Sequence, residues 1–206
     1  MSGKFVVFDG LDAAGKSLMA KKLKVHLEKN GFLGKVFLTF EPSQSVFGKE
    51  LRELLSKESD PAKNADKFLE LYVNDRRVHL EKEILPALRA GKIVLCDRFK
   101  YSTIVYQSVQ GIPVEKIVLL HAGMAVPDLV LIFDLDEKIA LKRISLSARK
   151  KLDVFEKEEF LKKVREKFLG LPNRLPKENI KIIDASKSKS RVFLQVKKEV
   201  GTLLLK

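Results

Sequence analysis

Hydrophobic residues along this chain gather into short continuous runs, and longer segments of mixed polarity separate these runs. The runs are rich in Val, Ile, Leu and Phe, and polar residues do not alternate with the apolar ones. Such runs are typical of strands that are buried on both faces, as they are in a parallel sheet. The predicted strands lie at residues 5–8, 36–40, 93–96, 129–133 and 180–183.

The segments between the strands have the apolar spacing of amphipathic helices. The predicted helices lie at about residues 16–30, 47–56, 66–90, 100–122, 137–150, 156–169 and 189–205. This alternation over 206 residues predicts an α/β fold, with a doubly wound, five-stranded parallel sheet flanked by helices. No internal repeat, low-complexity segment or linker interrupts the pattern, so residues 1–206 are expected to form a single domain.

The clearest motif follows the first predicted strand and opens the first predicted helix. It reads Gly10-Leu11-Asp12-Ala13-Ala14-Gly15-Lys16-Ser17 and fits the pattern G-x-x-x-x-G-K-[ST]. In such a phosphate-binding loop (P-loop), backbone N–H groups and the helix N-terminus surround phosphates. Lys16 is expected to reach the β- and γ-phosphates, and the Ser17 hydroxyl to ligate Mg²⁺. A strand-to-helix turn with a chance lysine is the alternative, but the flanking elements favour a nucleoside triphosphate site.

A second candidate lies where the predicted strand 93–96 ends in Asp97 and Arg98. Open parallel sheets bind their ligands at the carboxyl ends of the strands. Asp97 is placed to hold Mg²⁺ or its water shell there, and Arg98 suits a second anionic group. The alternative is that Asp97 caps a helix and Arg98 forms a surface ion pair.

Several motifs resemble the thymidylate kinase family and follow one another in the family's order over nearly the whole chain. The residues from Asp97 to Gln107, DRFKYSTIVYQ, are similar to the family signature D-R-Y-x-x-S-x-x-A-Y-Q, and DGLDAAGKS resembles its P-loop start. Shorter resemblances are Glu41-Pro42 with Gly48 and Arg52, LYVNDR at 71–76, PDL at 127–129, ALKR at 140–143 and IDA at 183–185. The chain departs from the family pattern at Phe40, Ser43-Gln44, Phe99 and Val154.

The resemblance implies the P-loop nucleoside monophosphate kinase fold and transfer of the γ-phosphoryl group of ATP to dTMP, giving dTDP and ADP. It also implies Mg²⁺ and a homodimer, for which segments 66–90 and 100–122 would supply the interface. Asp12 would approach the 3′-hydroxyl of the dTMP sugar. Arg98 and Arg52 would hold the acceptor phosphate.

For the nucleotide bases, the resemblance implies that Arg76 and Ser102, with Gln107, read the pyrimidine edge. Tyr72 would stack on thymine, and Tyr106 would crowd the 2′ position of the sugar and select deoxyribose. On the ATP side, Arg143 would lie against adenine with Ala185 nearby. The alternatives are that Tyr72 and Tyr106 are core aromatics, and that Arg52, Arg76 and Arg143 are solvated helix charges.

Phosphoryl transfer needs a positively charged side chain beside the negatively charged phosphoryl group that moves. The variable P-loop positions are Ala13 and Ala14, so no P-loop arginine is available. In kinases of the type that the chain resembles, this charge comes from an arginine in the P-loop or in a lid. The resemblance therefore implies a lid at about residues 145–156 that supplies Arg149, with Lys150 or Lys151 as substitutes. A basic cluster that only stabilises a helix C-terminus is the alternative.

Charge and composition narrow the remaining classes. The formal net charge is +13, and residues 137–206 carry +11 of it. The excess therefore belongs to the expected lid and adenine side and to solvated faces near 157–167, so it fits small polyanionic substrates, for which the resemblance implies ATP and dTMP, rather than nucleic acid or a membrane surface. No apolar run approaches the ~20 residues of a spanning helix. The single cysteine, Cys96, excludes a disulfide scaffold and suits a cytoplasmic location.

Three other functions stay open on the sequence alone. One is a broader pyrimidine nucleoside monophosphate kinase or a deoxynucleoside kinase. Another is a regulatory P-loop NTPase, although the guanine-reading motif N-K-x-D is absent from the sequence. The third is a nucleic-acid-binding ATPase, which only the net charge favours.

Overall fold

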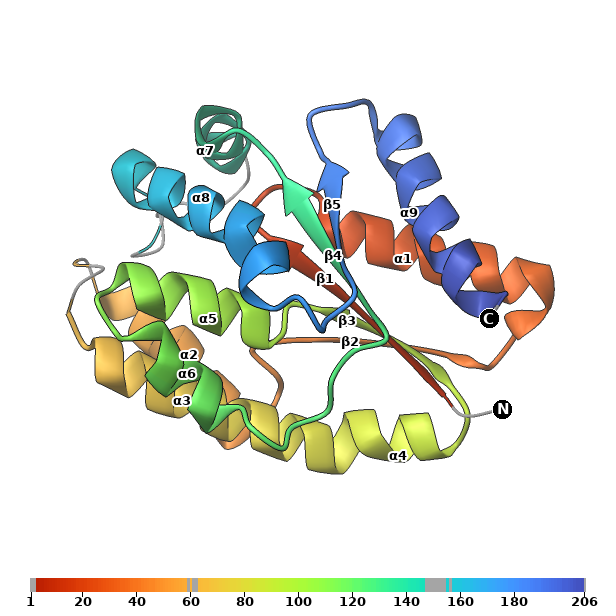
Figure 1. The fold of residues 1–206 in the computed structure, drawn as a ribbon, viewed down its shortest axis with the longest axis horizontal. Coiled ribbons are helices and arrows are strands. Elements are labelled where there is room, and N and C mark those ends of the chain that lie inside the picture. Colours follow the sequence, from red (N-terminus) through yellow and green to blue (C-terminus); the bar gives the residue numbers. More distant parts are fainter. Residues whose placement is uncertain (1–2, 59, 61–62, 147–154, 156, 206) are drawn as a thin grey trace.

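A parallel sheet forms the centre of the computed structural model, which describes residues 3–58, 60, 63–146, 155 and 157–205 (Figure 1). Its strands are β1 (Lys4–Gly10), β2 (Val36–Phe40), β3 (Ile93–Asp97), β4 (Leu129–Asp134) and β5 (Ile180–Asp184). All neighbouring strands are parallel, and their order is β2-β3-β1-β4-β5. The predicted five-stranded α/β fold is confirmed.

The central strands are apolar because helices cover both faces of the sheet. α1 and α9 pack on one face, and α5 and α8 pack on the other (Figure 1). In β1, the side chains from Phe5 to Phe8 are at most 1% exposed, as the continuous apolar run predicts. β1 and β3 are neighbours, and the helices that follow them lie on opposite faces. The carboxyl ends of these two strands are therefore the expected place for a ligand.

The helices follow the predicted segments, with two differences. They are α1 (Lys16–Leu27), α2 (Val46–Lys57), α3 (Ala65–His79), α4 (Leu85–Arg89), α5 (Lys100–Val109), α6 (Val114–Leu120), α7 (Glu137–Ser145), α8 (Glu158–Arg174) and α9 (Lys189–Leu204). A wider π-type turn at Leu80–Ile84 joins α3 to α4, whereas after α1 the backbone leaves the helical conformation at Asn30 and Gly31. Within the described ranges, the structure contains no helix with the length and apolarity that crossing a membrane requires.

The prediction of one helix over residues 100–122 is wrong, because the chain turns between α5 and α6. Gly111 adopts a φ of +100°, and Pro113, which lacks a backbone N–H, precedes α6. The end predicted for the helix at 169 is also wrong. α8 continues to Arg174 and contains Pro172.

Candidate functional site

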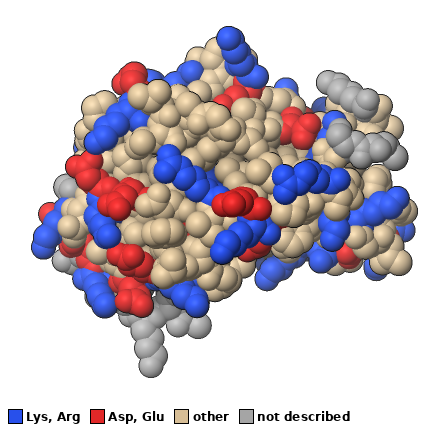
Figure 2. All heavy atoms as spheres, turned by 90° about the horizontal axis from the view of Figure 1, so that it is seen from below, with Lys and Arg blue, Asp and Glu red and all other residues tan. Residues whose placement is uncertain are grey.

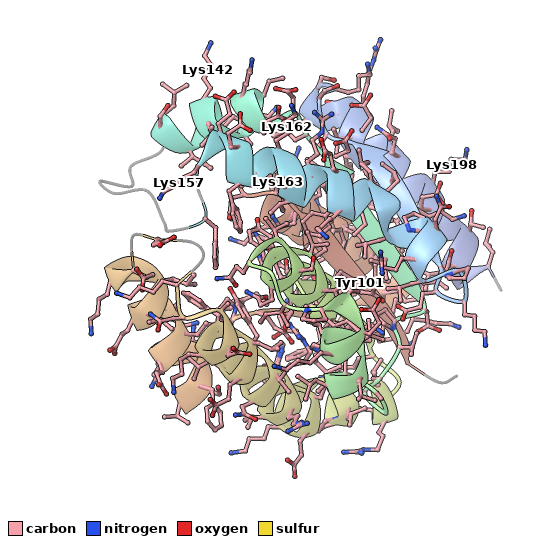
Figure 3. All side chains as sticks on the ribbon, turned by 60° about the vertical axis from the view of Figure 1, so that its left-hand side comes forward. Tyr101, Lys142, Lys157, Lys162, Lys163 and Lys198 are labelled. Carbon is pink, nitrogen blue, oxygen red and sulfur yellow. The ribbon has the colours of Figure 1, made fainter. Side chains whose placement is uncertain are left out.

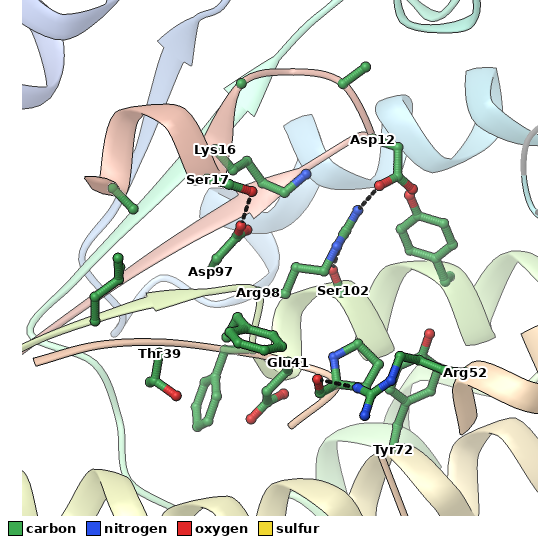
Figure 4. A pocket seen from close by; sticks show the side chains of 18 of the residues that line it. Asp12, Lys16, Ser17, Thr39, Glu41, Arg52, Tyr72, Asp97, Arg98 and Ser102 are labelled. Atoms are coloured by element: carbon green, nitrogen blue, oxygen red, sulfur yellow. Dashed lines mark hydrogen bonds and ion pairs between the residues drawn. The ribbon is translucent and has the colours of Figure 1, made fainter. Parts of the chain in front are cut away.

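A cavity of about 820 Å³ opens at the carboxyl ends of β1, β2 and β3 (Figure 4). The P-loop, the residues after β2 and the helices α2, α3 and α5 contribute to its wall. The predicted residues that line it are Asp12, Ala13, Gly15, Lys16, Ser17, Arg52, Tyr72, Arg76, Asp97, Arg98, Ser102 and Tyr106. The fold thus brings one P-loop and several separate predicted motifs into a single site.

The P-loop has the backbone that close approach to phosphate requires. Gly10 has a φ of +131°, and a Cβ there would lie 2.5 Å from the carbonyl oxygen of Phe133. Gly15 precedes α1 with a φ of +93°. Leu11 and Ala14 point into the core, where they are at most 3% exposed, so they support the loop from below.

Lys16 lies inside the P-loop with its ammonium group toward the cavity. Its Nζ donates a hydrogen bond of 2.6 Å to the carbonyl oxygen of Leu11. Burial, together with the positive charge of Arg98, lowers the pKa of Lys16 to about 8. The carboxylates of Asp12, Asp97 and Asp9 offset this shift only in part, so a bound anion would further stabilise the charged form of Lys16.

Ser17 and Asp97 bring two oxygen donors together at the start of α1. The Ser17 hydroxyl donates to Asp97 Oδ2 (Figure 4). Asp97 Oδ1 is buried and has no hydrogen-bond partner among the described residues. A hydroxyl and a carboxylate are donors that Mg²⁺ accepts, and Mg²⁺ commonly takes only one or two carboxylates beside the phosphates of a substrate. The described part of the chain holds no group of three or more His, Cys, Asp or Glu residues suited to a metal.

Arg98 directs a second positive charge into the same cavity. Its Nη2 donates to Asp12 Oδ1 at 2.9 Å, and its Nη1 donates to Ser102 Oγ at 2.7 Å. The Arg98 backbone is left-handed, with a φ of +72°, which is unusual for a residue with a side chain. A strained conformation held by several contacts is common in functional sites.

Asp9 holds this arrangement from the end of β1. Its carboxylate is fully buried and accepts from the Phe99 and Ser102 backbone N–H groups at 3.2 and 3.0 Å. It also accepts from the Ser102 hydroxyl at 2.5 Å. The cap of α5 therefore comes from a distant strand, because the preceding residue Phe99 has no capping side chain. Sequence reasoning assigned Asp9 no role, although it belongs to the P-loop match.

Arg52 approaches the cavity from α2 and is fixed by the loop after β2. Its Nη1 donates to the carbonyl oxygens of Pro42 and Ser43 at 2.8 and 2.9 Å. Ser43 departs from the family's glycine, and its hydroxyl donates to Asp75 Oδ1 at 2.5 Å. Asp75 also accepts from the Ser45 hydroxyl at 2.6 Å, so α3 holds this loop in place.

Arg76 is buried, with 1% of its surface exposed, so the alternative of a solvated helix charge is wrong. Its Nε and Nη2 donate to Glu41 Oε2 at 2.9 and 2.6 Å. Its Nη1 lies 2.6 Å from Nε2 of His121. Glu41 was visible in the sequence as part of the Glu-Pro match, whereas no motif marked His121.

Aromatic side chains form another wall of the cavity. Tyr72 is partly buried, and Tyr106 is 5% exposed although it lines the cavity. The Tyr106 ring lies 5.8 Å from the Arg98 guanidinium carbon and 5.4 Å from the ring of Phe155. Phe155 also lines the cavity, and sequence reasoning did not single it out for this place.

Other predicted residues lie elsewhere. Gln107 and Ala185 are buried and do not line the cavity, and Gln107 Nε2 donates to Gln110 Oε1 at 2.9 Å. Arg143 is exposed, but its Nη1 donates to the carbonyl oxygen of Ala13 at 3.2 Å, which places it beside the P-loop. The expected catalytic residue Arg149 and its substitutes Lys150 and Lys151 lie outside the described residues.

Comparisons with known proteins agree with this geometry. A sequence model of a family described as thymidylate kinase matches residues 8–196. The chain is 37% identical over 202 residues to a thymidylate kinase of Desulfotalea psychrophila, covering 98% of this chain and 96% of that one. It is 36% identical to a probable thymidylate kinase of Staphylothermus marinus, covering 97% and 95%. A solved structure of thymidylate kinase from Ehrlichia chaffeensis is similar with a TM-score of 0.75 and 28% identity, covering 97% of this chain and 99% of that chain.

Proposed function

The chain belongs to the thymidylate kinase family and is a phosphotransferase, and we propose that it uses this cavity to transfer the γ-phosphoryl group of ATP to dTMP. The products are dTDP and ADP. One observation carries the proposal: a P-loop with a buried lysine lines the same cavity of about 820 Å³ as three arginines, which are Arg52, Arg76 and Arg98. Two phosphorylated substrates can thus meet without a covalent enzyme intermediate.

The transfer joins an oxygen of the dTMP phosphate to the γ-phosphorus of ATP and breaks the bond from that phosphorus to the bridging oxygen of ADP. In this proposal the P-loop N–H groups and Lys16 hold the phosphates of ATP. Arg98 and Arg52 hold the acceptor phosphate in line with them. Their charges stabilise the phosphoryl group during transfer, and their fixed positions supply the alignment.

Mg²⁺ belongs to the proposal as the partner of ATP. Ser17 and Asp97 would hold it, directly or through water, because they present a hydroxyl and a free carboxylate oxygen beside the P-loop. When bound there, Mg²⁺ would neutralise part of the negative charge of the ATP phosphates.

The base and sugar of dTMP are proposed to occupy the wall made by α3 and α5. Tyr72 would stack on the pyrimidine, Arg76 and Ser102 would lie at its polar edge, and Tyr106 would crowd the 2′ position. Asp12, which pairs with Arg98 at 2.9 Å, would approach the 3′-hydroxyl. That all these residues line one cavity supports the assignment.

The adenine side and the assembly are further parts of the proposal. Arg143, which contacts the P-loop, would lie against adenine near Ala185.

A homodimer is proposed through the side of α3 and α6, where Leu119 is 74% exposed. Light scattering should then give about twice the chain mass of 23.4 kDa, and Leu119→Glu should shift the mass toward that of one chain. We place the reaction in the cytoplasm, which fractionation of the host cell tests.

An acceptor panel tests the reaction. dTMP, dUMP, dCMP, UMP and thymidine are each offered with Mg·ATP, and Lys16→Ala serves as the blank. We expect the highest kcat/KM with dTMP. Preference for thymidine would make the protein a deoxynucleoside kinase, and equal use of the monophosphates would make it a broader kinase. ATP hydrolysis that dTMP does not change would indicate a regulatory NTPase.

A further inference from the structure

A buried polar cluster stands behind the cavity wall and determines how Arg76 is presented. Arg76 and Glu41 form an ion pair at 2.6 Å, with 1% and 2% of their side chains exposed. His79 Nδ1 lies 3.2 Å from the other carboxylate oxygen of Glu41. The charge of Arg76 is thus already balanced, unlike the charges that the P-loop offers to phosphate. Arg76 can therefore offer a ligand a hydrogen bond rather than an unbalanced charge.

The partners of Arg76 leave one donor over. A guanidinium group has five N–H bonds. Nε–H and one Nη2–H point to Glu41, the other Nη2–H donates to Thr103 Oγ1 at 3.1 Å, and one Nη1–H points to His121. Among the residues that the structure describes, the second Nη1–H has no acceptor. Arg76 lines the cavity, so this N–H is the donor available to a ligand.

His121 can only act as an acceptor toward Arg76. Its Nδ1 lies 2.7 Å from the carbonyl oxygen of Ile117, and a carbonyl accepts hydrogen bonds, so Nδ1 carries the proton. Nε2 then presents its lone pair to Arg76 Nη1 at 2.6 Å. Burial and the positive charge of Arg76 lower the pKa of His121 to about 3, which keeps the ring neutral at physiological pH.

We propose that His121 is a positioning residue that fixes the Arg76 guanidinium so that a single Nη1–H faces the pyrimidine and requires a hydrogen-bond acceptor there. The inference rests on the proposed function and adds a residue to it. A carbonyl at that edge, as in thymine or uracil, accepts this hydrogen bond. The amino group of cytosine presents N–H against N–H and leaves the buried donor unpaired.

Rigidity matters to this selection, because a mobile guanidinium could turn another N–H toward a different ligand. Glu41 and Thr103 hold one side of the group, and the ring of Phe99 lies 5.1 Å from its central carbon. His121 is the remaining restraint, and it holds the nitrogen that carries the open donor. Removing its lone pair frees both Nη1–H bonds and the rotation of the group.

The test compares His121→Leu with His121→Gln, using dTMP and dCMP as acceptors. His121→Leu should raise the KM for dTMP about tenfold, leave kcat within about twofold, and lower the ratio of kcat/KM for dTMP over dCMP about tenfold. His121→Gln should restore most of that ratio, because its amide oxygen can accept from Arg76 while its N–H donates to Ile117. A folded His121→Leu enzyme with the wild-type ratio would overturn the proposal.

His79→Leu is the matched control, since His79 is also buried and its side chain lies within hydrogen-bond distance of Glu41 but not of Arg76. It should lower the melting temperature and leave the dTMP-to-dCMP ratio unchanged, and an equal loss of the ratio would show general loosening instead. If His121→Leu does not fold, Thr103→Val removes another restraint at constant volume and should lower the ratio about threefold; an unchanged ratio then overturns the proposal. A wild-type enzyme that does not prefer dTMP would instead refute the proposed function.

Discussion

At the scale of single residues, the burial of Lys16 makes its charge, and with it the binding of phosphate, depend on pH. Its pKa of about 8 means that the free enzyme loses the Lys16 charge at mildly alkaline pH. We predict that kcat/KM for ATP falls as pH rises through about 8, whereas the break in kcat lies higher because bound phosphates stabilise the ammonium. Rate profiles between about pH 6 and 10 measure both. Lys16→Arg should lose the break at 8, and a wild-type profile that is flat to pH 9 would contradict the assignment.

The same shift has a consequence for stability, with a definite sign. In the unfolded chain Lys16 keeps its proton up to about 10.5, so between 8 and 10.5 the unfolded state binds more protons than the folded state. The contribution of Lys16 to the free energy of unfolding therefore increases with pH across this window. Lys16→Met should remove that increase in denaturant titrations at pH 8 and 10.

Arg149 remains a prediction of the sequence, because it lies outside the described residues. If Arg149 closes over the phosphoryl group, Arg149→Ala should lower kcat by on the order of 10²–10⁴, the range that arginine fingers contribute to phosphoryl transfer. Single-turnover kinetics with saturating ATP and dTMP measure this. Lys150→Ala and Lys151→Ala are the neighbouring controls, and a loss below threefold in Arg149→Ala would point to one of them or to a helix-end role.

The residues that the sequence identified and those that it missed differ in how their partners are spaced. The P-loop and the Asp97-Arg98 pair lie in short motifs, so their chemistry can be predicted from the spacing of residues along the sequence. The Asp9 cap joins residues 93 positions apart, and the His121 contact joins residues 45 positions apart. Both depend on which helix lies against which strand, and no local pattern encodes that.

At the scale of elements, Gly48 shows how closely α2 approaches the loop before it. A Cβ at Gly48 would meet the backbone carbonyl of Ser43 and lie 2.8 Å from Asp75 Oδ1. Gly48→Ala should therefore destabilise the protein by about 2 kcal/mol or more and displace the Ser43 carbonyl that holds Arg52. Chemical denaturation and the KM for dTMP measure the two effects.

Gly201 in α9 is the matched control for that substitution. Apart from the backbone of α9 itself, no atom of the described residues lies within 4 Å of a Cβ at Gly201, so Gly201→Ala should stabilise the protein by about 0.5 kcal/mol through helix propensity. Equal effects of the two substitutions would mean that the approach of α2 to its loop does not constrain the site.

The elements themselves were largely predictable, because strands buried on both faces leave continuous apolar runs. All five predicted strands are present, each with its end shifted by two residues at most. The turn between α5 and α6 was missed because apolar residues continue through it, although Gly111 and Pro113 were signals for a break. The sequence did not predict that α8 continues through Pro172, because proline usually ends a helix.

At the scale of the whole molecule, most of the net charge of +13 comes from residues 137–206, which carry +11 of it. Exposed lysines project outward from α7, α8 and α9 and from the residue before α8 (Figure 3); they are Lys142, Lys157, Lys162, Lys163 and Lys198. On the side of α3 and α4, Asp and Glu lie among the Lys and Arg residues (Figure 2). Surfaces of mixed sign serve solubility better than they serve binding to a polyanion.

This distribution predicts weak and nonspecific binding to nucleic acid. We expect a labelled oligonucleotide to bind measurably at about 50 mM salt and to be released by about 200 mM, with the phosphotransfer rate unchanged by its presence. Fluorescence anisotropy and a coupled kinase assay measure the two quantities. Tight binding at physiological salt, or stimulation of ATP turnover by the oligonucleotide, would restore a nucleic-acid role.

The Asp9 carboxylate has one more consequence, which concerns solvent exchange. Amide hydrogens in the first turn of a helix normally exchange with deuterium quickly, because they have no partner within the helix. At α5 the Phe99 and Ser102 amides bond to the end of β1, so they exchange only when the strand and the helix separate. The phosphate-binding edge therefore opens together with the centre of the sheet. A bound nucleotide should slow exchange deep in β1 and β3, far beyond the atoms that it touches.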